Sequence, residues 1–305
     1  MNNSHSDKKE TGVNSFVYSH TAGEISSFFK KRDPFSNKGD YGRALLICGS
    51  KRMQGAAVLS AAGALRSGAG IVCTAFPDKA YPAIASKLTE SLLLPLDSDE
   101  DGFFAQSCID AALEEMKKAD AVLIGCGMGI TAGTKRLLKE VIKECRVPLV
   151  IDADGINILS KSINIIKSAR CPVVLTPHPG EMARLTGFTV DEIQSDRINT
   201  ARRFSDEYGV TVVLKGAGTV VCSPEDEKIY VNTTGNPGMA KGGSGDLLAG
   251  IITSFLSQGM SCKTASVCGT FLHGMAGDIA SEKLSQTASL PSDCANFLSE
   301  AFKKL

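Results

Sequence analysis

Residues 234–246 form a glycine-rich segment that leads without interruption into residues 247–258, where apolar side chains recur at helical spacing. The apolar residues on one face of this predicted helix are Leu247, Leu248, Ile251, Ile252, Phe255 and Leu256. The first N–H groups of a helix have no partner within it, and glycines let a ligand approach the backbone closely. The junction therefore predicts a phosphate site at the start of the helix, where the ionised form of Asp246 is favoured.

A simpler interpretation is that Asp246 only caps the helix, which would also account for one glycine. It leaves unexplained the five glycines among residues 235–245. The segment also lacks the Gly-x-x-x-x-Gly-Lys-Ser/Thr spacing, and Lys241 precedes the glycines that it would have to follow. We therefore expect a phosphate site that is not a P-loop.

The composition indicates a large globular domain with a small ligand. The chain has 305 residues, of which 43% are hydrophobic and 22% are charged, and this is ample for a large core. Its net charge of zero argues against a nucleic-acid or anionic-membrane surface, so we expect small-molecule partners, and a homo-oligomer stays open. Four histidines predict neither a zinc cluster nor a two-histidine metal helix.

Cysteine usage and hydropathy indicate the compartment. The ten cysteines include no Cys-x-x-Cys pair, and several lie in or beside apolar runs, which favours buried, reduced thiols. No run reaches the length of a membrane span, and the N-terminus lacks the apolar core of a secretory signal. We expect a cytoplasmic protein whose polar residues 1–20 are disordered.

Short apolar or β-branched runs alternate with helical patterns from Tyr41 onward. The predicted strands are 44–48, 71–76, 121–125, 148–151, 173–176 and 211–214, followed by a hairpin of 219–222 and 228–231. The predicted crossover helices are 55–68, 131–144, 156–167 and 191–208. This alternation is typical of a mostly parallel sheet covered by helices on both faces. We expect a single α/β domain over residues 21–305, because no repeat or composition break divides it.

Glycine, proline and polar residues follow four of the predicted strands, in residues 49–56, 125–129, 176–181 and 215–219. Taken singly, each segment is ordinary turn chemistry. The carboxyl ends of parallel strands meet at one edge of the sheet, where α/β proteins bind their ligands. Together with the glycine-rich segment, these loops predict a long cleft of backbone N–H groups, suited to a ligand with several phosphates.

Some side chains near these loops have both a functional and a structural interpretation. His178, between two prolines, could hydrogen-bond a substrate or be satisfied by backbone groups, and Glu181 could orient it. Lys215 could meet a phosphate or extend to solvent. Asp152 and Asp154 could hold Mg²⁺ through water, although one of them could instead cap a helix.

Residues 127–132 match the dinucleotide fingerprint Gly-x-Gly-x-x-Gly/Ala, with Asp152 about 20 residues further on. This match would predict an NAD-dependent dehydrogenase. We do not favour it, because the unit follows the third predicted strand rather than the first. It also leaves the glycine-rich segment 234–246 without a role.

A series of motifs occurs in order along the chain: Tyr41-Gly42-Arg43, Gly49-Ser50, Gly55-Ala56, Leu175-Thr176-Pro177-His178-Pro179-Gly180-Glu181, Lys215-Gly216-Ala217-Gly218-Thr219 and Lys241-Gly242-Gly243-Ser244-Gly245-Asp246. Together they resemble the NAD(P)H-hydrate dehydratase family, a branch of the ribokinase-like fold, over roughly residues 35–303. Ser244 departs from the threonine usual in that family but keeps the hydroxyl. No epimerase domain precedes the match, so we expect the single-domain form.

The resemblance implies a repair reaction. The hydrate of NADH or NADPH, with a hydroxyl at C6 of the nicotinamide ring, would be dehydrated at the expense of ADP or ATP, with Mg²⁺ as counter-charge. Hydroxide is a poor leaving group, whereas a phosphate ester leaves readily. Asp246 would be the catalytic base for phosphoryl transfer, and N–H groups of Gly243, Ser244 and Gly245 would stabilise the developing charge.

The resemblance also implies how the ligands are held. The hydrated coenzyme would lie on Ala56, Gly127, His178 and Asp246. The adenine nucleotide would lie on Lys215, Gly216, Ala217, Gly218, Thr219 and Gly245, and no protein ligand is assigned to Mg²⁺. The alternative is a ribokinase-like kinase of a vitamin-precursor alcohol, because the same glycine segment serves any hydroxyl acceptor. A nucleotide sensor without catalysis would not need Asp246.

Overall fold

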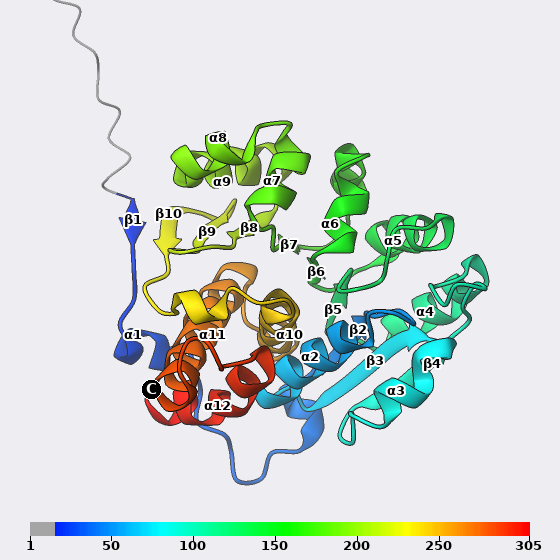
Figure 1. The fold of residues 1–305 in the computed structure, drawn as a ribbon, viewed down its shortest axis with the longest axis horizontal. Helices are drawn as coiled ribbons and strands as arrows, with labels where there is room; N and C mark the ends of the chain where they lie inside the picture. The colour runs from blue at the N-terminus through cyan, green and yellow to red at the C-terminus, as the bar shows by residue number, and fades with distance from the viewer. Residues whose placement is uncertain (1–15) are drawn as a thin grey trace, which may run out of the picture.

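The computed structural model describes residues 16–305 and contains a ten-stranded sheet (Figure 1). From one edge to the other, the strand order is β1-β10-β9-β8-β7-β6-β5-β2-β3-β4. The strands are β1 (Val17–Tyr18), β2 (Arg43–Ile47), β3 (Ile71–Pro77), β4 (Leu92–Leu96), β5 (Ala121–Ile124), β6 (Leu149–Ile151), β7 (Val173–Leu175), β8 (Thr211–Leu214), β9 (Val220–Ser223) and β10 (Asp226–Val231).

Neighbouring strands are parallel except where β9 pairs with β8 and β10. The carboxyl ends of the seven strands from β8 to β4 therefore meet at one edge. Successive residues of β2 point into different cores, with Leu46 on one side of the sheet and Leu45 on the other. Burial on both faces explains why the central strands are continuous apolar runs.

Helices cover both faces of the sheet, as predicted (Figure 1). One core involves α1 to α3 and α10 to α12, and the other involves α4 to α9. The α-helices are α1 (Ala22–Ser26), α2 (Gln54–Arg66), α3 (Tyr81–Ala85), α4 (Ile109–Met116), α5 (Ala132–Glu144), α6 (Asp154–Leu159), α7 (Pro179–Thr186), α8 (Val190–Ser195), α9 (Arg197–Tyr208), α10 (Ser244–Ser257), α11 (Cys262–Leu284) and α12 (Pro291–Lys303).

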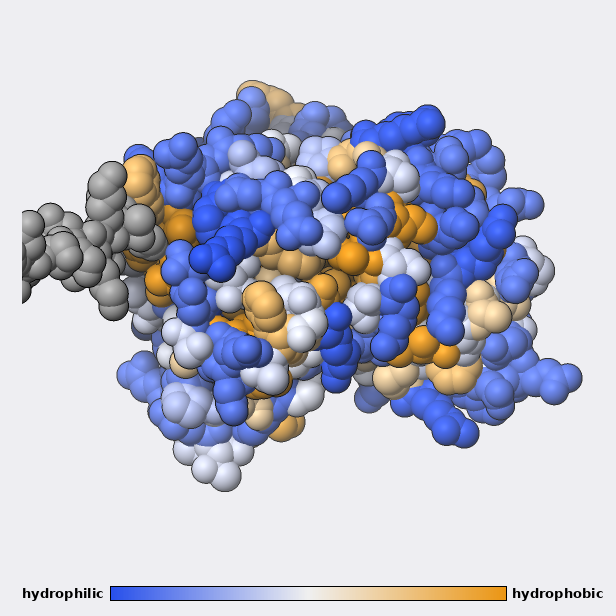
Figure 2. Space-filling view, turned by 90° about the horizontal axis from the view of Figure 1, so that it is seen from above, coloured by the Kyte–Doolittle hydropathy of each residue, from blue (hydrophilic) through white to orange (hydrophobic). Residues whose placement is uncertain are grey.

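Hydrophobic side chains lie mainly in these two cores. Figure 2 shows a face on which hydrophilic residues predominate and hydrophobic ones gather toward the middle. Over residues 16–305, no helix is long and apolar enough to cross a membrane.

The predicted strands and the β9–β10 hairpin are confirmed to within two residues at each end, as are the helices α2 and α5. Two predicted helices are interrupted. The predicted helix 156–167 is α6 followed by a 3₁₀ helix, Ile163–Ser168. The predicted helix 191–208 is α8 and α9, separated at Asp196, whose φ of −146° and ψ of 58° are not helical. The sequence patterns did not indicate β4, α11 or α12.

The N-terminal segment is ordered further than its polarity suggests. Residues 1–15 of the segment predicted to be disordered lie outside the described part of the chain. The prediction is wrong for Val17–Tyr18, which form β1 in parallel with β10. The aromatic ring of Tyr18 packs against that of Tyr230 at a centroid distance of 5.6 Å, and this contact holds the short strand at the sheet edge.

Helix α10 is buried along most of its length and packs against α2 at two glycines. A Cβ added at Gly63 would lie 2.3 Å from the carbonyl oxygen of Leu247, and one added at Gly250 would lie 2.0 Å from that of Ser60. The backbones of the two helices are therefore in direct contact. This contact fixes the start of α10 relative to α2 and the loop after β2.

The Gly63→Ala substitution is expected to lower the free energy of unfolding by about 1–3 kcal/mol, because the added methyl group meets the backbone of α10. On an open helix surface, the same change stabilises by about 0.5–1 kcal/mol. Gly55→Ala is the matched control on α2, since a Cβ there has no atom within 4 Å. Urea denaturation measures both variants, and stabilisation by Gly63→Ala would contradict the close contact.

Candidate functional site

Helix α10 begins at the glycine-rich junction, as predicted. Gly243 precedes it with a φ of 99°, a left-handed conformation that favours glycine. Within the described residues, no side chain caps the first turn, although Asp246 lies in it. The interpretation of Asp246 as a simple cap is therefore wrong, and the first N–H groups of α10 remain available to an anion.

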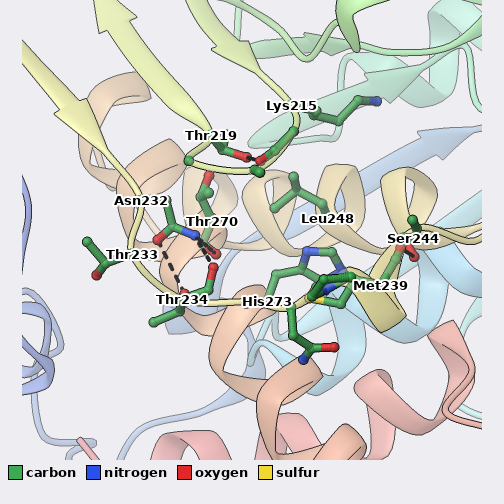
Figure 3. Close-up of a pocket in the computed structure, with 18 of the residues that line it drawn as sticks. Lys215, Thr219, Asn232, Thr233, Thr234, Met239, Ser244, Leu248, Thr270 and His273 are labelled. Atoms are coloured by element: carbon green, nitrogen blue, oxygen red, sulfur yellow. Dashed lines mark hydrogen bonds between the residues drawn. The ribbon is translucent and has the colours of Figure 1, made fainter. Parts of the chain in front are cut away.

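A cavity of about 460 Å³ opens beside this junction (Figure 3). Its size is within the usual range of small-molecule sites. Its walls come from the loop after β8, the segment after β10, the start of α10 and one face of α11. The lining residues are 215–219, 232–237, 239, 240, 244, 245, 248, 270, 273 and 274.

Seven of the eight residues predicted to bind the nucleotide line this cavity: Lys215, Gly216, Ala217, Gly218, Thr219, Ser244 and Gly245. Gly243 does not line it but turns the chain into α10. The two segments are in contact, since a Cβ added at Gly245 would lie 3.0 Å from Nζ of Lys215. The structure therefore brings the loop after β8 to the helix start, as the common edge of the strand ends predicts.

Lys215 forms a buried ion pair with Asp152, whose side chain is 1% exposed. The distance from Nζ to Oδ1 is 2.7 Å, and Glu181 Oε2 lies 4.0 Å from the same Nζ. Burial lowers the pKa of Lys215, but the two carboxylates outweigh it and the pKa is raised. Lys215 does not extend to solvent, and it is charged at the edge of the cavity.

Asp246 lies close to this pair, beside Cys126. Ligand atoms of Cys126, Asp152 and Asp246 are all within 4.8 Å of one another. Burial, and next the negative charge of Asp152, raise the pKa of Asp246 to about 6. A carboxyl group with this pKa is suited to accept a proton near neutral pH.

His178 is the N-cap of α7. This confirms the prediction that backbone groups satisfy its imidazole. Its Nδ1 accepts hydrogen bonds from the N–H groups of Gly180 and Glu181 at 3.0 and 3.3 Å, and its own N–H donates to Glu181 Oε2 at 2.8 Å. The side chain is 51% exposed, and Nε2 lies 3.4 Å from Glu181 Oε1. A contact between the exposed edge of the ring and a substrate stays a prediction.

Glu181 is itself an unusual carboxyl group, because its side chain is 5% exposed. Burial raises its pKa to about 7, and the charge of Lys215 opposes this shift. Glu181 therefore links the His178 cap to the ion pair, as a group that titrates near neutral pH.

Ala56 and Gly127, predicted to bind the coenzyme hydrate, are brought together. A Cβ added at Gly127, where φ is 62°, would lie 2.6 Å from Cβ of Ala56. Neither residue lines the cavity, and neither do His178 and Asp246. The predicted site residues therefore form two groups, one that lines the cavity and one at the loops after β2, β5 and β7, while Gly243 and Asp246 lie at the start of α10.

Asp152 and Asp154 were predicted either to hold Mg²⁺ through water or, for one of them, to cap a helix. The prediction of a cap is wrong, and that of a Mg²⁺ contact stays a prediction. Asp154 Oδ2 accepts a hydrogen bond from the N–H of Gly129 at 2.8 Å. In the described chain, α6 starts after Ala153 without a side-chain cap, so neither Asp152 nor Asp154 caps that helix. Both carboxylates lie at the carboxyl edge of the sheet, one held by Lys215 and the other by a backbone N–H group.

The dinucleotide-like segment 127–132 leads into a helix, α5, that has a side-chain cap, unlike the start of α10. Thr131 caps α5, and its Oγ1 accepts a hydrogen bond from the N–H of Thr134 at 3.2 Å. A side chain therefore occupies the position that a pyrophosphate would take at this helix start. This arrangement disfavours the dehydrogenase interpretation.

Sequence reasoning missed five of the nineteen residues that line the cavity. Asn232 and Thr233 directly precede the glycine-rich segment, so the segment could have been extended to include them. Thr270, His273 and Gly274 come from α11, which has no clear amphipathic pattern. Only the folded structure brings α11 to the cavity.

The sequence matches a family model described as NAD(P)H-hydrate dehydratase over residues 44–299. An ADP-dependent (S)-NAD(P)H-hydrate dehydratase from Neisseria meningitidis is 39% identical, with 88% of each chain covered. A bifunctional NAD(P)H-hydrate repair enzyme from Moorella thermoacetica is also 39% identical, over 93% of this chain and 54% of its own length. The chain therefore spans about half the length of that relative.

Two solved structures have the same architecture. An ADP/ATP-dependent NAD(P)H-hydrate dehydratase from Bacillus subtilis, co-crystallized with ATP and Mg²⁺, has a TM-score of 0.78 at 30% identity and covers 93% of this chain and 96% of its own. A ribokinase-like superfamily protein from Enterococcus faecalis has a TM-score of 0.82 at 27% identity, with 94% and 96% covered. The ribokinase-like fold is confirmed.

The Lys215→Met substitution is expected to lower the free energy of unfolding by about 3–5 kcal/mol, because it leaves the charge of Asp152 buried without a partner. Adding Asp152→Asn should recover most of this loss. Lys283→Met, which removes a more exposed pair with Glu300, should cost less than about 1 kcal/mol. Urea denaturation compares the variants. A double variant no more stable than Lys215→Met would contradict the proposed pairing.

Proposed function

Because the chain belongs to the NAD(P)H-hydrate dehydratase family, we propose that it dehydrates the C6 hydrate of NADH or NADPH to the coenzyme at the expense of ADP or ATP. The observation that carries this proposal is the position of Asp246. It directly follows Gly245, which lines the cavity, and lies beside Cys126, which directly precedes Gly127. One carboxyl group thus lies between the two groups of site residues.

The first step is phosphoryl transfer. The C6 hydroxyl oxygen forms a bond to the terminal phosphorus of ADP or ATP, the bond from that phosphorus to the bridging oxygen breaks and releases AMP or ADP, and Asp246 accepts the hydroxyl proton. The N–H groups at Gly243, Ser244 and Gly245 donate to the phosphate oxygens on which negative charge develops. The uncapped start of α10 supports this role, because its dipole and its free N–H groups favour an anion.

The second step is elimination. The lone pair of the ring nitrogen moves into the ring and expels C6-bound phosphate, and loss of the adjacent ring proton to water restores the dihydronicotinamide. One C–O bond and one C–H bond break, one C=C bond forms, and phosphate carries away the former hydroxyl oxygen. The protein therefore needs its acid–base machinery mainly for the transfer that precedes this step.

In this proposal, Lys215 and the loop Gly216, Ala217, Gly218 and Thr219 hold the adenine nucleotide. The ammonium group of Lys215 is kept charged and fixed by Asp152 at 2.7 Å, so it can face phosphate without first being ordered. Ala56, Gly127 and the exposed edge of His178 hold the coenzyme hydrate. The side chain of Ala56 leaves little room for any side chain at position 127.

Mg²⁺ fits this site as an ion that arrives with the phosphates. The group of Cys126, Asp152 and Asp246 contains a thiol, which is a poor ligand for a hard cation. Asp152, held by Lys215 and the thiol of Cys126, and Asp154, held by a backbone N–H group, would contact the ion through water. The ion would supply counter-charge to the transferring phosphate.

We further propose that residues 21–305 act as a single catalytic domain in the cytoplasm. The ten cysteines are all free thiols, and nine are buried, which is expected of a chain in a reducing compartment.

The proposal is tested with hydrated NADH, Mg²⁺ and either ADP or ATP. Reduced-nicotinamide absorbance should recover only when the nucleotide is present, and the donor that supports recovery is thereby identified. Asp246→Asn should abolish recovery, by at least about 10²-fold, because the base is lost. Asp110→Asn, the same change at an exposed first-turn position of α4, should have no effect. Folded protein that consumes neither donor would overturn the proposal and favour an alcohol kinase.

The pH dependence should report the titration of Asp246. Its carboxylate form is the base, and its pKa is raised to about 6. The active fraction therefore falls as pH drops through about 6, and kcat/KM should fall about tenfold for each further pH unit. Steady-state rates between pH 5 and 8 measure this limb. A kcat/KM that stays nearly constant down to pH 5, as expected of an aspartate with its ordinary pKa near 4, would contradict the assignment.

A further inference from the structure

His273 is a buried polar group for which the proposed reaction has no use. It projects from α11 into the wall of the cavity and is 7% exposed. Among residues 16–305, its Nε2 atom has no hydrogen-bond partner. A buried polar atom without a partner costs free energy, and such atoms are rare in folded proteins. The position of this atom at a ligand-sized cavity suggests that the partner is a ligand.

The imidazole is neutral in the cavity. Burial, and next the positive charge of Lys215, lower the pKa of His273 to about 4. A neutral imidazole has one N–H donor and one nitrogen acceptor. It therefore suits a ligand group that carries uncharged donors and acceptors, such as a ribose hydroxyl or a purine edge.

The cavity has two chemically different parts (Figure 3). Lys215 and the start of α10 at Gly245 supply positive charge and free N–H groups, which suit phosphate. Leu248 lies one helical turn further along α10 than Ser244, and Met239 supplies a thioether. Figure 3 shows His273 near Leu248 and Met239, and Lys215 further from it at the edge of the cavity. His273 therefore belongs to the more apolar part.

The backbone of α11 around His273 is also well fixed. A Cβ added at Gly274 would lie 2.2 Å from Thr234 Oγ1, and one added at Gly277 would lie 2.3 Å from Sδ of Met239. These contacts hold α11 against residues 234–239, which line the cavity on the adjacent side. A polar group held in place before binding loses little freedom when the ligand arrives, so its hydrogen bond contributes more to affinity.

We propose that His273 hydrogen-bonds the nucleoside part of the adenine nucleotide and thereby sets the affinity of the cavity for nucleosides over bare polyphosphates. This inference rests on the nucleotide-binding half of the proposed function and is independent of the dehydration chemistry. It separates the cavity into a phosphate part around Lys215 and Gly245 and a nucleoside part around His273.

The test is calorimetric titration of the full chain with AMP, ADP and inorganic tripolyphosphate, in the absence of coenzyme hydrate. His273→Leu keeps an apolar side chain of similar size and removes the hydrogen bond. This variant should bind AMP and ADP more weakly by the same factor, about tenfold, and should bind tripolyphosphate with unchanged affinity. His273→Gln, whose amide can reach the position of Nε2, should retain more of the affinity than His273→Leu.

Ser266→Ala is the matched control. Ser266 is also on α11, and within the described chain its buried Oγ has no partner, but it does not line the cavity. The Ser266→Ala variant should bind all three ligands with the same affinity as the unmodified chain. Thermal unfolding of each variant verifies that it is folded.

Three results would overturn the inference: unchanged AMP and ADP affinity in folded His273→Leu, an equal loss for tripolyphosphate, or no nucleotide binding by the unmodified chain. An equal loss for tripolyphosphate would move the contact to the phosphate part. If ADP binds and His273→Leu weakens it as expected, but hydrated NADH is not converted, the inference stands and the dehydratase proposal fails.

Discussion

The direct contact between the backbones of α2 and α10 determines where the site can form. Gly63 and Gly250 allow the two helices to touch. Helix α11 also packs closely against α10, because a Cβ added at Gly269 would lie 2.8 Å from the side chain of Ile252. Helix α10 is thus held between two neighbours through positions without side chains. Its N-terminus is thereby fixed at the carboxyl edge of the sheet, where the loops after β2, β5, β7 and β8 meet. A shift of α10 would move the anion site and Asp246 together.

The same edge concentrates negative charge around a single lysine. Lys215 is paired with Asp152 at 2.7 Å and lies 4.0 Å from Glu181, and Asp246 is next to this pair. One buried ammonium group cannot neutralise three carboxylates, so the less well compensated ones are harder to ionise. Burial and this crowding together raise the pKa values of Asp246 and Glu181 to about 6 and about 7, with burial as the larger cause. A base that titrates near neutral pH therefore arises from burial beside other carboxylates.

The sequence predicted those parts of the fold whose patterns are local. Buried parallel strands appear as apolar runs that end in glycine or proline, and their common direction places the following loops at one edge. The edge strand β4 was missed because Pro95 interrupts its apolar run and the helix before it is short. Helix α11 was missed because it is buried on nearly all sides, and such a helix has no polar face to mark its period.

The candidate site likewise combines parts with a local sequence signal and parts that depend on tertiary packing. The loop 215–219 and the junction at 243–246 were recognisable because glycines and polar residues at strand and helix ends are a local signal. The capping role of His178 could be weighed from sequence but not decided, because only the structure shows which ring nitrogen is used by the backbone. The contribution of α11 has no local signal at all, since His273 reaches the cavity through a tertiary contact. In a site built this way, the phosphate-binding half is encoded in contiguous segments, whereas the half that would distinguish one ligand from another depends on packing.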